Sequence, residues 1–358
     1  MNTQATIGAG QFENLEKRVL FSAIEVTDFG AKPNDGQNDR GAIQAAIDSA
    51  HDGDTVFFAD GTYNVGGQIT LKSGINITGE NELGAMLEFS VPVNGGDING
   101  TNYAFRGVGL HDFSFTNLKV KSNNGVFFLQ DTSNTRFTDN DFQWGYGGNY
   151  YNRLAFYASN NQTRMRIEEN YFHDSPDSDR NVELWGLADS SYSYNRFHNV
   201  RDGGHIMEPR SNVQISFNRG TKIHRMGIEI QGHSTTTRLV VEGNVLSDWD
   251  RPWNDTFGLS VMMMNSPDTK IINNYLSADF SGGWGQSQPG VGGPRFGLAI
   301  EAGLSGGEVS GNVIGGPNPW ACGVATAMQN TLVTNNKFYG HPLWGIMMGA
   351  SLCDEYRC

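Results

Sequence analysis

The sequence is short of cationic residues and of long apolar runs. Lys and Arg together number 25 against 38 Asp and Glu, which leaves a formal net charge of −13. A basic face dominates proteins that bind nucleic acid or anionic membranes, so this charge balance argues against both as general partners. It leaves room for a local basic site. No apolar run approaches the roughly 20 residues that cross a bilayer, so we predict no membrane span.

Cysteine is also scarce, since the chain has only Cys322, Cys353 and Cys358. Cys353 and Cys358 are close enough in sequence to form a small disulfide loop, which would leave Cys322 unpaired. The alternative is that all three are free thiols. No Cys/His spacing is typical of a metal site. The piece GVGGPRFG lacks the strand–helix context of a phosphate loop, and no Ser lies in a G-x-S-x-G elbow. We therefore predict no bound cofactor and no metal ligands.

Residues 1–20 lack the charged start and apolar block of an ordinary signal peptide. Residues 12–23, FENLEKRVLFSA, nevertheless resemble a Leu-Glu-Pro-Arg-type motif of some bacterial surface and exported proteins, with Lys17 in place of the proline. The resemblance implies a secreted or cell-surface protein, and an amphipathic segment packed on the body is the alternative. We treat residues 1–23 as an N-terminal extension and 24–358 as the folded domain.

What the chain has in abundance is glycine and a repeat. The 46 Gly and an apolar content of 38% fit a turn-rich β architecture. An Asn recurs near the end of a β-rich strand at intervals of 23 to 38 residues, and the shorter intervals set a coil of a β-solenoid. Stacked Asn side chains can hydrogen-bond one another as an internal ladder, so we assign them a structural role. The nine are Asn117, Asn140, Asn170, Asn195, Asn218, Asn244, Asn274, Asn312 and Asn336.

The start of the domain resembles a known superfamily. The run VTDFGAKPNDGQNDRGAIQAAIDSA and the later GDTVFFADGTYNV are similar to the opening of pectate-lyase-like proteins. The resemblance implies an all-β solenoid, a single-stranded right-handed parallel β-helix, here of about ten coils. It says little about chemistry, because that superfamily contains lyases, hydrolases, epimerases and phage tailspikes.

A helix is expected inside this opening segment. Asn38 or Asp39 can N-cap it, and Ile43, Ala46 and Ile47 lie on one apolar face. Such a helix would cover the open end of the solenoid and its strand edge. We therefore predict a cap over residues 24–65 and Asn-ladder coils over residues 66–349.

The candidate chemistry centres on residues 204–233. Glu208 and Glu229, 21 residues apart, hold the same place in two copies of one pattern (229 − 208). With Glu183 they are expected to form an outward column on three successive coils, and Glu301 is expected level with Gln231. Alternate residues should point inward. The expected core residues of these strands are Val182, Leu184, Ile228, Ile230, Leu259 and Val261.

Paired carboxylates of this kind suit glycoside hydrolysis, because stacking raises the pKa of one carboxyl so that it can act as the general acid. We predict Glu208 and Glu229 as the acid/base pair, with Glu183 and Glu301 in reserve. Aromatic, Gly-rich loops should wall a groove for sugars. The predicted substrate-binding residues are His205, Arg210, Arg201, Arg225, Gln231, His233, Trp249, Trp253, Tyr146 and Trp284.

Three simpler interpretations compete: solvated surface, a structural ion network of Glu with Arg201, Arg210 and Arg225, and a Ca²⁺ site. A glycoside hydrolase ranks first among the functions. A lyase or epimerase on a uronic polysaccharide such as alginate or pectin, which could use Ca²⁺, ranks second. The Asp-Pro-His-Glu signature of mannuronan epimerases is absent, and MEPR at 207–210 is the nearest match. A non-catalytic glycan-binding solenoid ranks third, and in each case the expected partner is a polysaccharide bound by a monomer.

Overall fold

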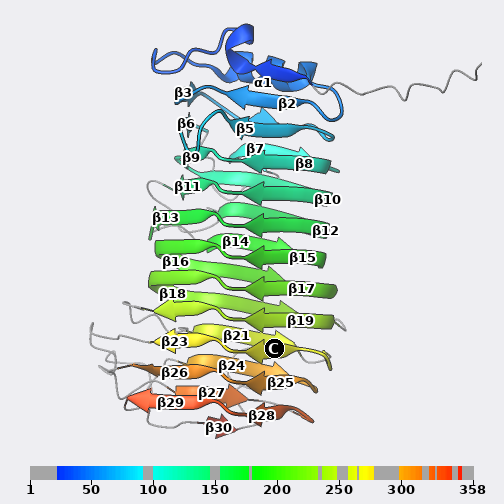
Figure 1. Cartoon of the computed structure of the whole chain (residues 1–358), viewed down its shortest axis with the longest axis vertical. Helices are drawn as coiled ribbons and strands as arrows, with labels where there is room; N and C mark the ends of the chain where they lie inside the picture. The colour runs from blue at the N-terminus through cyan, green and yellow to red at the C-terminus, as the bar shows by residue number, and fades with distance from the viewer. Residues whose placement is uncertain are drawn as a thin grey trace, which may run out of the picture.

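The protein is one long stack of parallel strands with a helix at its N-terminal end (Figure 1). The computed structural model describes residues 22–91, 100–145, 154–176, 180–232, 236–247, 257–263, 266–277, 298–316, 322–326, 329–340 and 346–348. Every strand pairing among them is parallel and joins one coil to the next, which confirms the predicted all-β parallel solenoid. The coil count and the division into extension, cap and ladder coils stay predictions.

Three parallel sheets run along the stack, and four long strands bend from one sheet into another. The first sheet contains β4 (Ile69–Thr70), β7 (Tyr103–Val108), β10 (Gly125–Thr138), β12 (Leu154–Glu168), β14 (Arg180–Trp185), β16 (Arg196–Met207), β18 (Arg219–Gly232), β21 (Phe257–Met263), β24 (Leu298–Leu304), β27 (Cys322–Thr326) and β30 (Ile346–Met348). The second sheet shares β10 and β12 and adds β1 (Ala23–Glu25), β2 (Thr55–Phe58), β5 (Asn76–Gly79), β8 (His111–Thr116), β15 (Leu187–Ser193), β17 (Ser211–Ser216), β19 (Thr237–Glu242), β22 (Lys270–Ile272), β25 (Glu308–Ser310) and β28 (Leu332–Thr334). The third sheet shares β16 and β18 and adds β3 (Gly61–Val65), β6 (Ala85–Phe89), β9 (Lys119–Ser122), β11 (Asp141–Trp144), β13 (Tyr171–Ser175), β20 (Val245–Ser247), β23 (Tyr275–Ser277), β26 (Val313–Gly316) and β29 (Lys337–Gly340).

Helix α1 (Arg40–Ser49) follows a short 3-10 turn, η1 (Val26–Phe29), and forms where the sequence predicted it. Ile43, Ala46 and Ile47 are buried against the first coils. The carboxylate of the N-cap residue, Asp39, accepts hydrogen bonds from the backbone N–H groups of Lys32 and Asn64 rather than from the helix. The expected capping bond comes instead from Asn38, whose Oδ1 accepts from the N–H of Arg40 at 3.1 Å.

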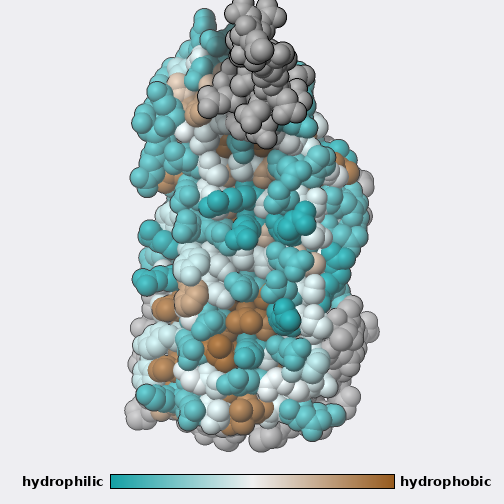
Figure 2. All heavy atoms as spheres, turned by 45° about the vertical axis from the view of Figure 1, so that its right-hand side comes forward, coloured by the Kyte–Doolittle hydropathy of each residue, from teal (hydrophilic) through white to brown (hydrophobic). Residues whose placement is uncertain are grey.

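Alternation along each strand separates core from surface. The six expected core residues, from Val182 to Val261, are all buried, and they join one continuous apolar cluster with the aromatic rings of the earlier coils. The outer surface is mainly hydrophilic or neutral on the face that Figure 2 shows, with apolar residues gathered in a small area toward the C-terminal coils. The period-2 pattern thus specifies which side of each strand is buried.

The Asn ladder exists, but it has eight members rather than nine. From Asn140 to Asn336 each side-chain Nδ2 donates to the Oδ1 of the next Asn at 2.9–3.1 Å. Asn117 lies outside the ladder because Leu118 occupies the ladder position of its coil: the Leu118 N–H donates to Asn140 Oδ1 at 3.1 Å. Asn117 has φ +64°, a left-handed turn conformation that Asn tolerates better than most residues. The predicted place of Asn117 in the ladder was therefore wrong, although its Oδ1 accepts from the Leu83 N–H at 3.2 Å and so has a structural role.

Candidate functional site

The outward column of the first sheet differs from the predicted one. Glu183 on β14 pairs in register with His205 on β16, and His205 pairs with Glu229 on β18. Glu229 pairs with Ser260, and Ser260 with Glu301. Glu301 is therefore level with Glu229 and not with Gln231 as expected. A histidine, and not a third glutamate, separates the first two carboxylates.

Glu208 does not stack with Glu229. Strand β16 ends at Met207, which is level with Gln231, and Glu208 follows in a left-handed turn with φ +47°. Its backbone N–H donates to the carbonyl of Gln231 at 2.7 Å. The true coil repeat here is the 24 residues from His205 to Glu229 (229 − 205), so the matched spacing of 21 was misleading.

Glu183, His205 and Glu229 form the centre of a buried charged cluster. His205 Nδ1 lies 3.7 Å from Glu183 Oε2, and His205 Nε2 lies 3.6 Å from Glu229 Oε2. The imidazole is only 8% exposed, and neither ring nitrogen has a hydrogen-bond partner. Arg180 forms an ion pair with Glu183, and the Gln231 amide donates to Glu229. This arrangement resembles the ion-network interpretation, with Arg180 and His205 as partners of the glutamates.

These contacts keep Glu183 ionised. Burial raises the pKa of its carboxyl, but the His205 imidazole, the Arg180 guanidinium and the Trp185 indole outweigh burial and lower that pKa to about 2. Trp185 Nε1 donates to Glu183 Oε1 at 2.8 Å. The expectation that stacking would keep one carboxyl protonated therefore does not hold for Glu183, because its column neighbour is an imidazole and not a second acid.

Asp202, at the bend of β16, also contacts the cluster. Arg180 Nε lies 3.9 Å from Asp202 Oδ2, and Asp202 Oδ1 accepts from the Met226 N–H at 3.0 Å. Asp202 is buried, while Arg201 beside it is half-buried. The sequence analysis missed Arg180, Asp202 and Trp185. Trp185 could have been found, because it lies two positions after Glu183 on the same outward face.

An open pocket of about 410 Å³ lies beside this cluster, toward the N-terminal coils. Its lining residues are Tyr157, Ser159, Asn160, Asn161, Trp185, Gly186, Glu208 and Arg210. Trp185 connects the two features, since its side chain lines the pocket and its indole N–H donates to Glu183. The pocket thus has one cation, one carboxylate, one phenol and one indole around an open space.

Arg210 is an exposed side chain held in place by neutral groups. Its Nε donates to the Gly186 carbonyl at 3.0 Å, and its Nη2 lies 3.4 Å from Thr163 Oγ1. Within the described ranges Arg210 makes no ion pair, so its guanidinium keeps donors for an anionic ligand. Burial and the nearby Glu183 carboxylate raise the pKa of Tyr157, which therefore remains a neutral phenol and a proton donor.

Several predicted residues fall outside what the structure describes. These are His233, Trp249, Trp253, Tyr146 and Trp284, together with the side chains of Arg225 and Glu301. Among the described residues, no group of three or more His, Cys, Asp or Glu side chains is placed to hold a metal ion. No described helix is long and apolar enough to span a bilayer.

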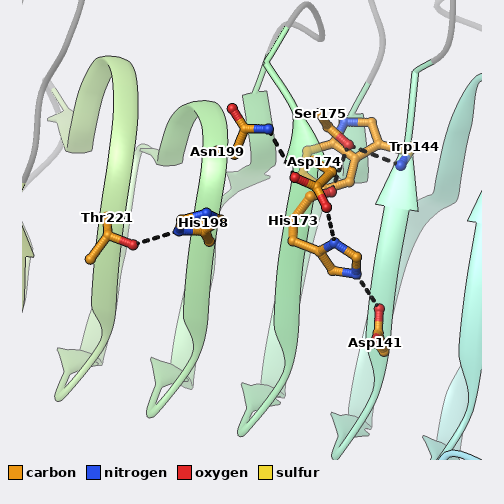
Figure 3. Close-up of polar contacts among 8 residues, drawn as sticks. All are labelled: Asp141, Trp144, His173, Asp174, Ser175, His198, Asn199 and Thr221. Atoms are coloured by element: carbon orange, nitrogen blue, oxygen red, sulfur yellow. Dashed lines mark hydrogen bonds and ion pairs between the residues drawn. The ribbon is translucent and has the colours of Figure 1, made fainter.

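A second polar cluster lies on the outer face of the third sheet (Figure 3). His173 Nε2 hydrogen-bonds Asp141 Oδ1 at 2.6 Å, and its Nδ1 hydrogen-bonds Asp174 Oδ2 at 2.9 Å. Asn199 donates to Asp174 Oδ1 at 2.8 Å. Burial opposes protonation of His173, but the two aspartates outweigh it and raise the pKa of the imidazole. The two carboxylates are thereby engaged by neighbours on adjacent coils.

Similar proteins are found by sequence and by structure. Residues 23–249 match the family "Rhamnogalacturonase A/epimerase, pectate lyase-like". Alginate lyase 7 of Azotobacter vinelandii is 28% identical over 211 residues, which are 51% of this chain and 23% of that protein, so the chain spans about a quarter of its length. The A-module of the mannuronan C-5 epimerase AlgE6 of A. vinelandii superimposes with a TM-score of 0.54 at 14% identity, over 91% of this chain and 99% of that one. The Streptococcus pneumoniae surface adhesin PfbA gives a TM-score of 0.56 at 16% identity, over 92% and 100%.

The structural likenesses are at low identity and concern the fold. The family match covers well over half of the chain, including β14, β16 and β18, which carry the charged cluster. It agrees with the resemblance of the opening segment and with the parallel solenoid described above. The chain belongs to the rhamnogalacturonase A/epimerase family of pectate-lyase-like parallel β-helix proteins.

Proposed function

We propose that the protein is a lyase or epimerase that removes the proton next to the carboxylate of a uronic acid unit in an acidic polysaccharide. The observation that carries the proposal is the exposed Arg210, without an acidic partner in the described part of the chain, in a pocket that also contains Tyr157 and Glu208. The alginate lyase and epimerase among the similar proteins support the same reaction class. The surface adhesin and the motif at 12–23 support a secreted or cell-surface location.

Each pocket residue has a distinct task in this proposal. Arg210 pairs with the uronate carboxylate through two N–H donors and stabilises the negative charge that develops there. Glu208 accepts the C5 proton as the general base. Tyr157, held neutral by its raised pKa, donates a proton. Trp185 offers an aromatic surface to the apolar face of the sugar ring.

The proton balance separates the two outcomes. In the lyase, the electron pair of the C5–H bond forms the C4–C5 double bond, the C4–O bond breaks, and the leaving oxygen takes the proton of Tyr157. In the epimerase, the C4–O bond stays intact, and Tyr157 gives its proton to C5 from the face opposite to Glu208. Both outcomes need the same carboxylate clamp, so Arg210 is required for either.

Hydrolysis by a carboxylate pair is the weaker candidate. It needs one carboxyl to be protonated as general acid, whereas the pKa of Glu183 is about 2. Glu208 and Glu229 lie at different positions of the coil, with Glu229 in the buried cluster and Glu208 at the pocket. The pair first chosen from sequence spacing therefore loses the geometric reason for its choice.

The test is a panel of alginate, polygalacturonate and neutral polysaccharides in deuterated buffer. Three signals are measured: ultraviolet absorbance, deuterium incorporation and reducing ends. A lyase gives ultraviolet absorbance from the new double bond, and an epimerase gives deuterium at C5 without chain cleavage. Arg210→Ala should reduce either signal on the order of 100-fold, while Arg136→Ala, an exposed arginine of the second sheet, should not. Reducing ends without unsaturation or deuterium would make the protein a hydrolase, and full activity of Arg210→Ala would remove Arg210 from the mechanism.

A further inference from the structure

We propose that the protein has a second binding surface for an acidic polysaccharide, on the third sheet and the turn that precedes it. It is made by Tyr194, Arg196, Phe217 and Arg219, which we call the aromatic–arginine strip. The strip is separate from the pocket on the first sheet and would hold a polymer without reacting with it. It goes beyond the proposed function, because it requires no catalysis.

Two aromatic rings stand exposed on adjacent coils at this turn. Tyr194 is 54% exposed and Phe217 is 42% exposed. Their ring centroids are 5.1 Å apart with an angle of 19° between the planes, so they stack nearly parallel. The Phe217 ring also lies against Gly243 of the next coil, where a Cβ atom would come within 2.5 Å of it. Together they present a continuous aromatic surface to solvent.

The backbone at both positions disfavours aromatic residues. Tyr194 has φ +60° and Phe217 has φ +59°, a left-handed conformation that is costly for bulky side chains. The equivalent positions of the following coils hold Gly243, Asn273 and Gly311, residue types that accept this conformation. The fold itself therefore has a cheaper solution at this turn. Strained residues of this kind are typical of binding sites.

The pairing of the two neighbouring arginines is also unfavourable for the stability of the fold. Arg196 on β16 and Arg219 on β18 are paired directly in register, and both side chains are exposed. Like charges in such a pair repel each other. Neither makes an ion pair within the described residues, although the Arg196 guanidinium lies 4.9 Å from the centroid of the Tyr171 ring. In a chain with a net charge of −13, this is a local concentration of positive charge.

Acidic side chains near the strip do not neutralise it. Asp141, in the same outward column as Arg196, is bound by His173 at 2.6 Å, as Figure 3 shows. Glu169 precedes Tyr194 by one coil at the turn and makes no ion pair in the described part of the chain. An external carboxylate can therefore supply the missing counter-charge.

The ligand class follows from the combination. Aromatic faces pack on the apolar face of a sugar ring, and guanidinium groups bind carboxylates through paired N–H donors. The coils repeat about every 4.8 Å along the axis, a spacing close to the length of one pyranose unit, so successive coils can meet successive sugars. A nucleic acid would demand many more cations than two. An acidic polysaccharide satisfies both halves of the strip.

The first test changes the charges. Arg196→Ser with Arg219→Ser should weaken binding of long-chain alginate or polygalacturonate at least tenfold, measured by titration calorimetry or affinity electrophoresis. The matched control is Arg136→Ser with Arg166→Ser, because these two arginines are also exposed and paired in register, on the second sheet. Equal losses in both double variants, or no loss in either, would overturn the proposal.

The second test changes the rings and separates binding from folding. Tyr194→Asn with Phe217→Gly installs the residue types that the later coils use at the same turn. Polymer affinity should fall at least tenfold while the melting temperature stays the same or rises. A fall in melting temperature without a fall in affinity would show that the stack is only structural and would overturn the proposal. Tighter binding of single-stranded DNA than of the polysaccharides would also overturn it.

These measurements are made in the Arg210→Ala background, in which the polymer is consumed about 100-fold more slowly. Turnover of short oligosaccharides is then compared for strip variants that retain Arg210, and it should be unchanged. Strip-dependent polymer binding by a protein without turnover on the panel would support the strip and refute the proposed function. Turnover on the panel by a protein whose polymer binding does not depend on the strip would support the proposed function and refute the strip.

Discussion

Replacing Glu183 with Gln tests whether the charged cluster keeps this carboxylate ionised. The change removes one charge and almost no volume, and Gln retains an oxygen that can accept from the Trp185 indole N–H. It takes away an ionic partner of Arg180 and of His205, both of which face the Oε2 atom of the carboxylate. Because the Glu183 side chain is only 14% exposed, water compensates little for that loss.

The size of the effect follows from the pKa. The cluster lowers the pKa of Glu183 from 4.5 to about 2, and each pH unit corresponds to about 1.4 kcal/mol. Ionisation of Glu183 therefore contributes about 3 kcal/mol to the free energy of unfolding at neutral pH. Since the pKa is depressed in the folded state, this contribution is complete above the unfolded pKa and is lost as the pH falls toward about 2. At pH about 3 roughly 1 kcal/mol should remain.

The assay is urea denaturation of the wild type and of Glu183→Gln between neutral pH and pH about 3. The difference between the two proteins should shrink as the pH falls. Glu169→Gln is the control, since Glu169 is exposed and makes no ion pair in the described ranges, and it should show no such trend. A difference that is constant across this pH range, or a carboxyl titration of Glu183 centred at or above 4.5 by NMR, would refute the argument and return Glu183 to the candidate general acids.

Two further predictions concern stability. Asn218→Ala removes four hydrogen bonds, at 2.9–3.1 Å, from a fully buried amide. Thermal melts should show that it lowers the free energy of unfolding by about 3–5 kcal/mol. Asn117→Ala, outside the ladder, should lower it by about 1 kcal/mol in the same measurement. A similar cost for both would mean that the ladder adds nothing beyond a local turn. The raised pKa of His173 means that its charge stabilises the fold fully below the unfolded pKa of 6.5 and less as the pH rises through the folded value. His173→Gln should therefore destabilise more at pH about 5 than at pH about 9, and the opposite order in urea titrations would contradict the assignment.

The fold could be predicted because its signals are repeated. One amphipathic helix, a turn-rich composition and an Asn that recurs in successive coils all favour the same structure, a capped β-solenoid. Asn117 shows the limit. In the segment FTNLKV the Asn comes one residue before the position that Leu118 fills, and only the pairing of Leu118 with Asn140 reveals it. Residue type identifies a ladder, while register decides its members.

Register also explains the errors at the site. Strict alternation with the buried Ile206 places His205 and Met207 outward, so Glu208 could face outward only after the strand had ended. Which residue stacks on Glu229 depends on the length of the bend within β16, and periodicity within a strand does not report this. Arg180 was missed for a related reason, because its ion pair with Glu183 forms across the start of β14 and leaves no repeated mark in the sequence.

The Asn ladder has a direction as well as a length. From Asn140 to Asn312 each Nδ2 donates one hydrogen bond to the next Asn toward the C-terminus, and the Oδ1 of that Asn faces back toward the N-terminal coil, so the amide dipoles point the same way. Aligned dipoles add along an axis as they do in an α-helix, and hydrogen bonds in such a chain polarise one another. The solenoid therefore contains a buried electrostatic axis whose positive end lies at the Asn336 coil and whose negative end lies at the Asn140 coil. A substitution at Asn218 divides that axis into two shorter ones, whereas a substitution at Asn336 only trims its end.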